Sequence, residues 1–268
     1  MVSASPSLVA LDMDGTLIDG TGQIPDDFWD LLGRAQFAGM TIAPASGRQL
    51  ATLRDMFSVT NTRPDTFIAE NGSVVWHRGK IVSTSPMRRD IVLRILEALD
   101  KAPSGMHVVL CKPDYSCTAE TMPPEVTAEV DKYYHANRHV ASLIDEVDTQ
   151  VVKIALFVES DAEKDGVPLV SGVAPDYTVA VSSKHWLDVM APGVNKGVAL
   201  MELAKVLGIK QEDTAAIGDY LNDFEMLQQA GLAVAMENAH PDLKAIADEV
   251  AESNIEHGAL KKIREWLN

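Results

Sequence analysis

The stretch Leu8–Leu17, LVALDMDGTL, begins with four apolar residues and then turns abruptly polar. An apolar run that stops at a Gly-Thr turn is typical of a buried strand in a parallel sheet, and ligand sites lie where such strands end. Asp12 and Asp14 stand two positions apart at that end, so both carboxylates can point to the same side. Clustered carboxylates repel each other unless a cation lies between them, and Mg²⁺, which prefers oxygen ligands, suits them better than Zn²⁺. The stretch therefore predicts a metal-assisted carboxylate site in an α/β fold.

The composition is that of a globular chain with an acidic surface. Of the 268 residues, 46% are hydrophobic, enough for one large domain or two modest ones. The net charge of −16 argues against nucleic acid and anionic membranes as partners, because both require clustered Lys and Arg. Cys111 and Cys117 form no paired C-x-x-C motif, so we expect neither a zinc site nor a disulfide framework. The segment Met1–Ser7 lacks a basic start and no apolar run reaches membrane length, so we expect a cytoplasmic protein.

The spacing of apolar residues changes twice along the chain. Short apolar runs alternate with helical periodicity over residues 8–79 and again after Leu187, which predicts a parallel sheet with crossover helices. We therefore expect a Rossmann-like parallel-sheet core of residues 1–81 and 188–268, interrupted by an inserted α/β domain of residues 82–187. The expected core strands are residues 8–12, 41–45, 67–69, 214–217 and 232–235, with a hairpin over 74–82. Expected helices start at Pro25 and Ser46, run from Lys196 to Leu207, and carry Phe224 and Leu227. In the insert we expect strands 107–111, 151–158 and 177–182, one helix marked by Ile91, Ile95 and Leu99, and another marked by Val126, Val130 and Tyr133 or Tyr134.

Four separated segments place polar residues where a strand ends or a helix begins. They are Asp12-x-Asp14-Gly15-Thr16, Ser46-Gly47-Arg48, Asn195-Lys196-Gly197 and Gly218-Asp219-x-x-Asn222-Asp223. Any one of them alone is more often a solvated turn or an ordinary helix cap. Their order and context along one chain favour a shared site.

This set of motifs resembles the haloacid dehalogenase-type phosphatases, specifically the Cof-type group of subclass IIB. The resemblance spans nearly the whole chain and rests on LDMDGTL at 11–17, SGR at 46–48, ENG at 70–72, NKG at 195–197, GDYLND at 218–223 and the tail from Ala230 to Gly258. It implies a Mg²⁺-dependent phosphatase of small phosphorylated metabolites, such as sugar phosphates or related cofactor precursors, with the insert as a cap domain that selects the substrate. Glu237 and Ala259 depart from the pattern, which puts only local loop geometry in doubt.

The resemblance also implies roles for individual acids. Asp12 would be the nucleophile that forms an aspartyl phosphate, and Asp14 the general acid and base. Mg²⁺ would be held by Asp12, the backbone carbonyl of Asp14 and Asp219, with Asp223 in support.

Other residues of the motifs would bind the phosphate. Ser46 and Lys196, both at helix starts, would complete the catalytic set by holding the transferring oxygens. Gly47, Arg48 and Asn222 are candidates for phosphate or substrate binding, although Arg48 could equally pair with a core carboxylate. Asn71 would brace the site.

Two other functions remain open at this point. A phosphomutase of the same superfamily, phosphomannomutase-like, uses the same acids and returns the phosphate to a sugar, and the motifs barely separate the two. A phospho-accepting signalling module also combines clustered acids, a hydroxyl, a lysine and Mg²⁺, but its acceptor aspartate lies in the middle of a shorter domain without an insert. The expected partner is a small-molecule phosphate ester, and the oligomeric state is left open.

Overall fold

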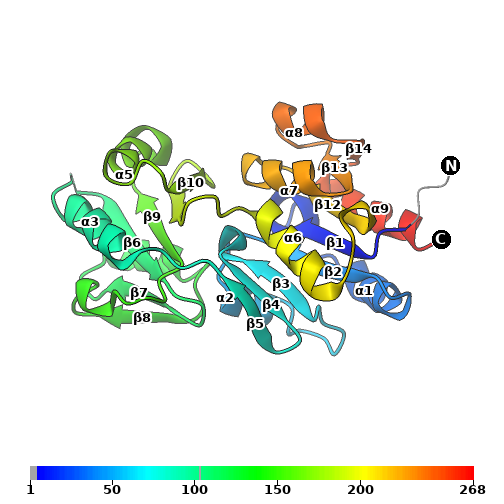
Figure 1. Cartoon of the computed structure of the whole chain (residues 1–268), viewed down its shortest axis with the longest axis horizontal. Coiled ribbons are helices and arrows are strands. Elements are labelled where there is room, and N and C mark those ends of the chain that lie inside the picture. Colours follow the sequence, from blue (N-terminus) through cyan, green and yellow to red (C-terminus); the bar gives the residue numbers. More distant parts are fainter. Residues whose placement is uncertain (1–4, 103) are drawn as a thin grey trace. The chain divides into compact units, whose positions relative to one another are not determined.

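The computed structural model describes residues 5–102 and 104–268. It divides into two compact units, each with its own sheet (Figure 1). The first contains residues up to Ser46, Asp55–Ser83 and Asn195–Asn268, and the second contains Gly47–Arg54 and Thr84–Val194. No helix in the described ranges is long and apolar enough to cross a membrane. The assignment of residues 82–187 to a cap that selects the substrate stays a prediction.

The first unit is built on an eight-stranded sheet with the order β14-β13-β12-β1-β2-β3-β4-β5. The strands are β1 (Leu8–Asp12), β2 (Thr41–Ala45), β3 (Thr66–Ala69), β4 (Val74–His77), β5 (Lys80–Thr84), β12 (Thr214–Gly218), β13 (Leu232–Met236) and β14 (Glu249–Ala251). The strands from β14 to β3 are parallel, and β4 runs antiparallel to β3. The predicted α/β fold with a Rossmann-like parallel-sheet core is confirmed.

Helices alternate along the chain with the parallel strands of the first unit. They are α1 (Asp27–Phe37), α6 (Lys196–Leu207), α7 (Phe224–Gln229), α8 (Pro241–Ile246) and α9 (Gly258–Trp266), while α2 (Leu50–Met56) crosses the boundary between the units. The α1 helix buries Phe28, Leu31, Leu32 and Ala35, the face that helical spacing predicts. The α6 helix starts where the Asn195 side chain accepts a hydrogen bond from Val198 N, and it ends at Gly208, whose φ is 69°.

The register of the central strands brings three motifs to one edge of the first sheet. Leu8 of β1 pairs with Thr41 of β2 on one side and with Thr214 of β12 on the other. Asp12 lies opposite Ala45, the residue before Ser46, and Asp219 directly follows β12. Because parallel strands end at the same edge, the first, second and fourth motifs leave the sheet there together.

The second unit contains a six-stranded sheet with the order β10-β11-β9-β6-β7-β8. Its strands are β6 (Met106–Cys111), β7 (Ser116–Ala119), β8 (Asn137–Val140), β9 (Lys153–Val158), β10 (Thr178–Val181) and β11 (Trp186–Met190), and its helices are α3 (Arg89–Asp100), α4 (Pro124–Val130) and α5 (Val167–Val173). All neighbouring strands are antiparallel except β7 and β8. The helix predicted to reach Tyr133 or Tyr134 is wrong in its length, because α4 ends at Val130 and the two tyrosines follow it in a turn.

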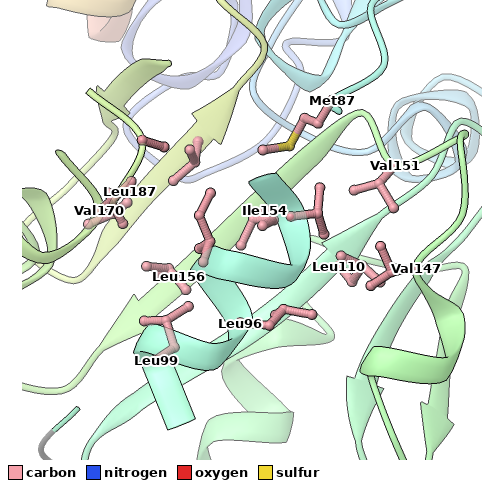
Figure 2. Packing of buried hydrophobic residues seen from close by; sticks show 14 of the residues in the cluster. Met87, Leu96, Leu99, Leu110, Val147, Val151, Ile154, Leu156, Val170 and Leu187 are labelled. Atoms are coloured by element: carbon pink, nitrogen blue, oxygen red, sulfur yellow. The ribbon is translucent and has the colours of Figure 1, made fainter. Parts of the chain in front are cut away.

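One face of the second sheet packs against helices to form a hydrophobic core (Figure 2). Alternate residues of β9, among them Ile154 and Leu156, lie in this core with Leu96 and Leu99 of α3 and Val170 of α5. Each such buried aliphatic side chain contributes roughly 1.5–3 kcal/mol to the free energy of unfolding. Since strand residues alternate, the intervening residues of β9, beginning with Lys153, lie on the opposite face of this sheet.

Candidate active site

A lysine between two carboxylates forms the centre of the candidate site in the first unit. Lys196, the first residue of α6, donates hydrogen bonds to Asp12 Oδ1 and to Asp223 Oδ1, both at 2.6 Å. All three side chains are buried. The predicted convergence of residues separated by up to 211 positions in the sequence, Asp12 and Asp223, is therefore observed, and Lys196 fixes the direction of the Asp12 carboxylate.

Backbone amides hold the second carboxylate of this lysine in place. Asp223 Oδ2 accepts hydrogen bonds from Asp219 N at 3.1 Å and from Tyr220 N at 3.4 Å. A Cβ atom at position 218 would lie 2.6 Å from the same oxygen, so only glycine fits there. The GDYLND motif thus folds back on itself and orients Asp223 toward Lys196.

The turn after β1 holds the Asp219 carboxylate at close range. Gly15 has a φ of 82°, and a Cβ atom on it would lie 2.2 Å from Asp219 Oδ2. Both the backbone conformation and the close contact therefore require glycine at this position. Thr16 Oγ1 donates to Asp219 Oδ1 at 3.5 Å. Asn238 Nδ2 donates to Gly15 O at 2.9 Å and lies 3.4 Å from Asp219 Oδ2.

Three carboxylates in this cluster are close enough to share a cation. One oxygen each of Asp12, Asp219 and Asp223 lies within 4.8 Å of the others. The donors are all carboxylate oxygens, the type that Mg²⁺ prefers, and Lys196 balances only part of their negative charge. These residues therefore fit a hard divalent cation.

The pKa values of the aspartates and the lysine in this cluster reflect the same excess of negative charge. Burial, and next the charge of Asp223, raise the pKa of Asp12 well above its usual range. The same two causes raise the pKa of Asp219 to about 7. Burial alone would lower the pKa of Lys196, but Asp12 and Asp223 outweigh it and raise that pKa. Lys196 is thus a permanent cation, and a second positive charge would be needed to keep both aspartates ionised.

The other predicted residues are placed as follows. Asp14 lies exposed on the turn after β1, and its side chain is not part of the three-carboxylate cluster, in keeping with a predicted role through its backbone carbonyl. Ser46 is buried, and its backbone donates to Ile68 O and accepts from Asn71 N. Asn222 Nδ2 donates to Asn71 Oδ1 at 3.3 Å, which matches the bracing expected of Asn71.

Gly47 and Arg48 belong to the second unit, where the Arg48 guanidinium lies 4.9 Å from the centre of the Tyr133 ring.

Asn238 was not predicted as a site residue. Besides its bonds to the Gly15 turn, its Oδ1 accepts from Asn254 N at 3.1 Å. It stands two residues after β13, at the carboxyl end of a parallel strand. The strand-end criterion that singled out Asp12 would have found it too.

Taken together, these features define a candidate enzyme site at the carboxyl edge of a parallel sheet, in which a lysine and three carboxylates fit a divalent cation. Residues 9–263 match the model of the haloacid dehalogenase-like hydrolase family. The chain belongs to this family.

Curated relatives of the chain carry phosphatase names. It is 29% identical to a 5-amino-6-(5-phospho-D-ribitylamino)uracil phosphatase of Escherichia coli strain K12, over 98% of this chain and 97% of the relative. It is 28% identical to the HMP-PP phosphatase of Cronobacter sakazakii, over 89% and 86% of the two chains. The prediction of an enzyme of the haloacid dehalogenase phosphatase class is confirmed.

Solved structures agree with this assignment. A haloacid dehalogenase-like hydrolase from Bacillus subtilis has a TM-score of 0.84 at 26% identity, covering 96% of this chain and 99% of that one. A subclass IIB sugar phosphatase has a TM-score of 0.80 at 25% identity, covering 97% and 98%. The predicted relation to subclass IIB is thereby confirmed.

Proposed function

We propose that the chain is a Mg²⁺-dependent phosphatase that hydrolyses small phosphorylated metabolites through a phosphoaspartate on Asp12. The observation that carries the proposal is the pair of 2.6 Å hydrogen bonds by which Lys196 holds Asp12 beside Asp223. Asp12, Asp219 and Asp223 would hold the ion together with the Asp14 carbonyl. When bound, Mg²⁺ supplies positive charge that relieves repulsion between a carboxylate and a phosphate dianion.

The first half of the reaction uses Asp12 and Asp14. A carboxylate oxygen of Asp12 forms a bond to phosphorus in line with the leaving oxygen, whose bond to phosphorus breaks. Asp14 gives its proton to the departing alkoxide. The exposure of Asp14 on the turn, against the burial of Asp12, agrees with this division of roles, because the proton donor must reach the leaving group.

The second half restores the enzyme. Asp14, now ionised, takes a proton from water, the water oxygen bonds to phosphorus, and the bond from phosphorus to Asp12 breaks. Lys196 stays protonated throughout and stabilises the charge on Asp12 and on the phosphoryl oxygens. Ser46, at the edge of the sheet beside β1, would donate its hydroxyl to the transferred group.

The substrate class is proposed from the relatives. They are named as a 5-amino-6-(5-phospho-D-ribitylamino)uracil phosphatase, an HMP-PP phosphatase and a sugar phosphatase. We infer a small phosphate ester for this chain. Hydrolysis is favoured over a mutase reaction because these relatives are named phosphatases, and we expect the product to be free orthophosphate.

The test is Asp12→Asn in the full chain with Mg²⁺ and p-nitrophenyl phosphate. Phosphate release should fall by roughly 10⁴-fold or more, since loss of a nucleophile removes the covalent route. Asp26→Asn, an exposed change at the start of α1, is the control and should keep the wild-type rate. Unchanged turnover in folded Asp12→Asn would refute the nucleophile, and conversion of a sugar phosphate to its isomer without orthophosphate would point to a mutase.

A further inference from the structure

The outward face of α1 carries an exposed aromatic side chain. The helix packs beside β2 and α9 of the first unit (Figure 1), and its buried residues are Phe28, Leu31, Leu32 and Ala35. Because successive residues of a helix are turned by about 100°, Phe37 projects from the side opposite to these residues. Phe37 is 96% exposed, more than any other large hydrophobic residue in the part of the chain that the structure describes.

A groove lies beside Phe37 on the same side of the first unit. It has a volume of about 440 Å³, and its walls come from α1, from Thr62 before β3 and from Leu267 near the end of the chain. Trp29 and Leu267 line it with apolar surface, and Gly33 adds no side chain to it. The groove is large enough for an aromatic side chain. The outward face of α1 therefore presents a protruding phenyl ring and an apolar groove next to each other.

The charged residues on this face are complementary to one another. Asp30 and Arg34 lie one helical turn apart at the groove, and both are exposed. No ion pair joins either of them to another described residue, and Arg34 Nη2 donates one hydrogen bond, of 3.4 Å, to Asn268 Oδ1. When a second copy of the helix lies antiparallel on the first, the acid of each copy faces the base of the other. The charge pattern therefore fits a second copy of this chain.

We propose that the outward face of α1 is the interface of a twofold symmetric dimer of this chain, an inference that does not depend on the phosphatase proposal. In an antiparallel pair of α1 helices centred on Gly33, the rise of about 1.5 Å per residue brings Phe37 level with Trp29 of the second copy. The same register leaves Arg34 about 3 Å along the helix axis from Asp30 of the second copy, which its long side chain spans.

This arrangement also accounts for the residue types on the face. Gly33 at the centre lets the two helices approach closely, because no side chain separates them. Each Phe37 enters the groove of the other copy, so both rings leave water together. Aromatic residues and arginine, here Trp29, Phe37 and Arg34, are the types enriched at protein interfaces.

The first test removes the protruding ring. Sedimentation equilibrium of the full chain over about 1–500 μM should show a mean mass that rises toward that of two chains. Phe37→Asp should raise the dimer dissociation constant by roughly 100-fold or more, because a symmetric interface loses the same aromatic anchor twice. Val206→Asp is the matched control, since it places the same charge at an exposed residue of α6 outside the groove, and it should keep the wild-type constant.

A charge-reversal series tests the twofold register. Asp30→Arg and Arg34→Asp should each raise the dissociation constant by roughly 10-fold, because like charges then face each other across the axis. An equimolar mixture of the two single variants should associate as tightly as the wild type, since the arginines of one chain then meet the aspartates of the other. The double variant Asp30→Arg/Arg34→Asp should recover in the same way. These recoveries would also show that the variant chains are folded.

Three results would overturn the proposal. The wild-type chain could stay monomeric over the whole concentration range, or its dimer could persist unchanged in Phe37→Asp. A mixture of Asp30→Arg and Arg34→Asp that associates no more tightly than either variant alone would show that α1 does not pair with itself. Growth beyond two chains would also contradict a twofold contact, because only an open contact continues to add copies.

Discussion

Lys196 of the first unit and Lys153 of the second are both buried, yet their nitrogens contact different kinds of group. Lys196 Nζ lies 2.6 Å from two carboxylates, whereas Lys153 Nζ lies 2.8 Å from a backbone carbonyl and 3.4 Å from a carboxylate. Around Lys196 negative charge is in excess, as the raised pKa values of Asp12 and Asp219 show. The cluster around Lys196 can therefore take a cation, whereas Lys153 holds a backbone carbonyl of the second unit.

The comparison also separates two uses of a buried charge. A charge that faces reacting atoms changes the rate of chemistry, because its stabilisation is largest where charge develops. A charge that holds a backbone carbonyl in place contributes to the stability of the unit that contains both groups. Substitution of Lys196 should therefore change the rate of the reaction, and substitution of Lys153 should change mainly the free energy of unfolding.

Lys196→Met should give the largest effect within this comparison. It leaves Asp12 and Asp223 buried without their common cation, so the pKa of Asp12 rises further and the nucleophile is neutralised. We expect kcat to fall by roughly 100- to 1,000-fold. The free energy of unfolding should fall by roughly 3–5 kcal/mol, as measured by urea denaturation.

Lys153→Met sharpens this contrast. Loss of its charge-assisted hydrogen bond to Gly47 O should lower the free energy of unfolding by roughly 1.5–3 kcal/mol, measured by urea denaturation, and leave kcat closer to the wild-type value. If both lysine variants lost kcat to the same extent, the separation between a catalytic and a structural charge would fail.

Asp219→Asn tests the excess negative charge through pH. With the pKa of Asp219 raised to about 7, the folded chain without metal keeps a proton that the unfolded chain releases near pH 4. Its free energy of unfolding therefore falls as the pH rises from about 4 to about 7. Asp219→Asn should reduce this fall by roughly 1–3 kcal/mol, measured by urea denaturation in EDTA across that interval.

The control for the pH series is again Asp26→Asn, whose exposed side chain should leave the wild-type slope unchanged. Adding Mg²⁺ should restore stability at pH 7 to the wild-type protein and much less to Asp219→Asn. If the free energy of unfolding fell equally with pH in the wild type and in Asp219→Asn, the Asp219 carboxylate would not be destabilised in the folded cluster.

Asn238→Ala should give the smallest effect. It removes the hydrogen bonds of Asn238 with Gly15 O, Asp219 Oδ2 and Asn254 N, and it leaves the carboxylates and Lys196 in place. Each of these exposed hydrogen bonds is worth roughly 0.5–1.5 kcal/mol, and only part of that loss acts on the reaction, so we expect kcat/KM to fall by about 2- to 10-fold. The neighbouring exposed Glu237→Gln is the control and should not change kcat/KM. A loss as large as that of Lys196→Met would make Asn238 a member of the reacting cluster.

The sequence predicted the elements of the first unit well because each has a strong local pattern. The strand Leu8–Asp12, the strand Thr41–Ala45 and the helix Lys196–Leu207 have the predicted bounds. Because the carboxyl ends of parallel strands lie at one edge of a sheet, the sequence also predicted that Asp12, Asp219 and Asp223 would meet. Their carboxylates do lie together. Their catalytic and metal-binding roles stay predictions.

Other features depend on contacts that no local pattern encodes. Tyr133 and Tyr134 continue the apolar spacing of α4 but fold back to pack against Trp186, at ring-centre distances of 5.7 and 6.1 Å. Strand β7 has only four residues, SCTA, so its sequence gives little periodicity to detect. Lys153 reads as an ordinary charged residue at a strand start, and only the structure shows that its nitrogen meets the main chain beside Ser46.

The pairing of β1 with both β2 and β12 has a consequence for synthesis. Leu8 is paired with Thr41 early in the chain, but its other neighbour, Thr214, is translated only after the whole second unit. Domains emerging from a ribosome generally fold as units. The second unit can therefore complete its core while β1 of the first unit still lacks its neighbour β12. Asp12 therefore meets Lys196 and Asp223 among the last events of biogenesis, and a nascent chain arrested before Lys196 would be catalytically silent.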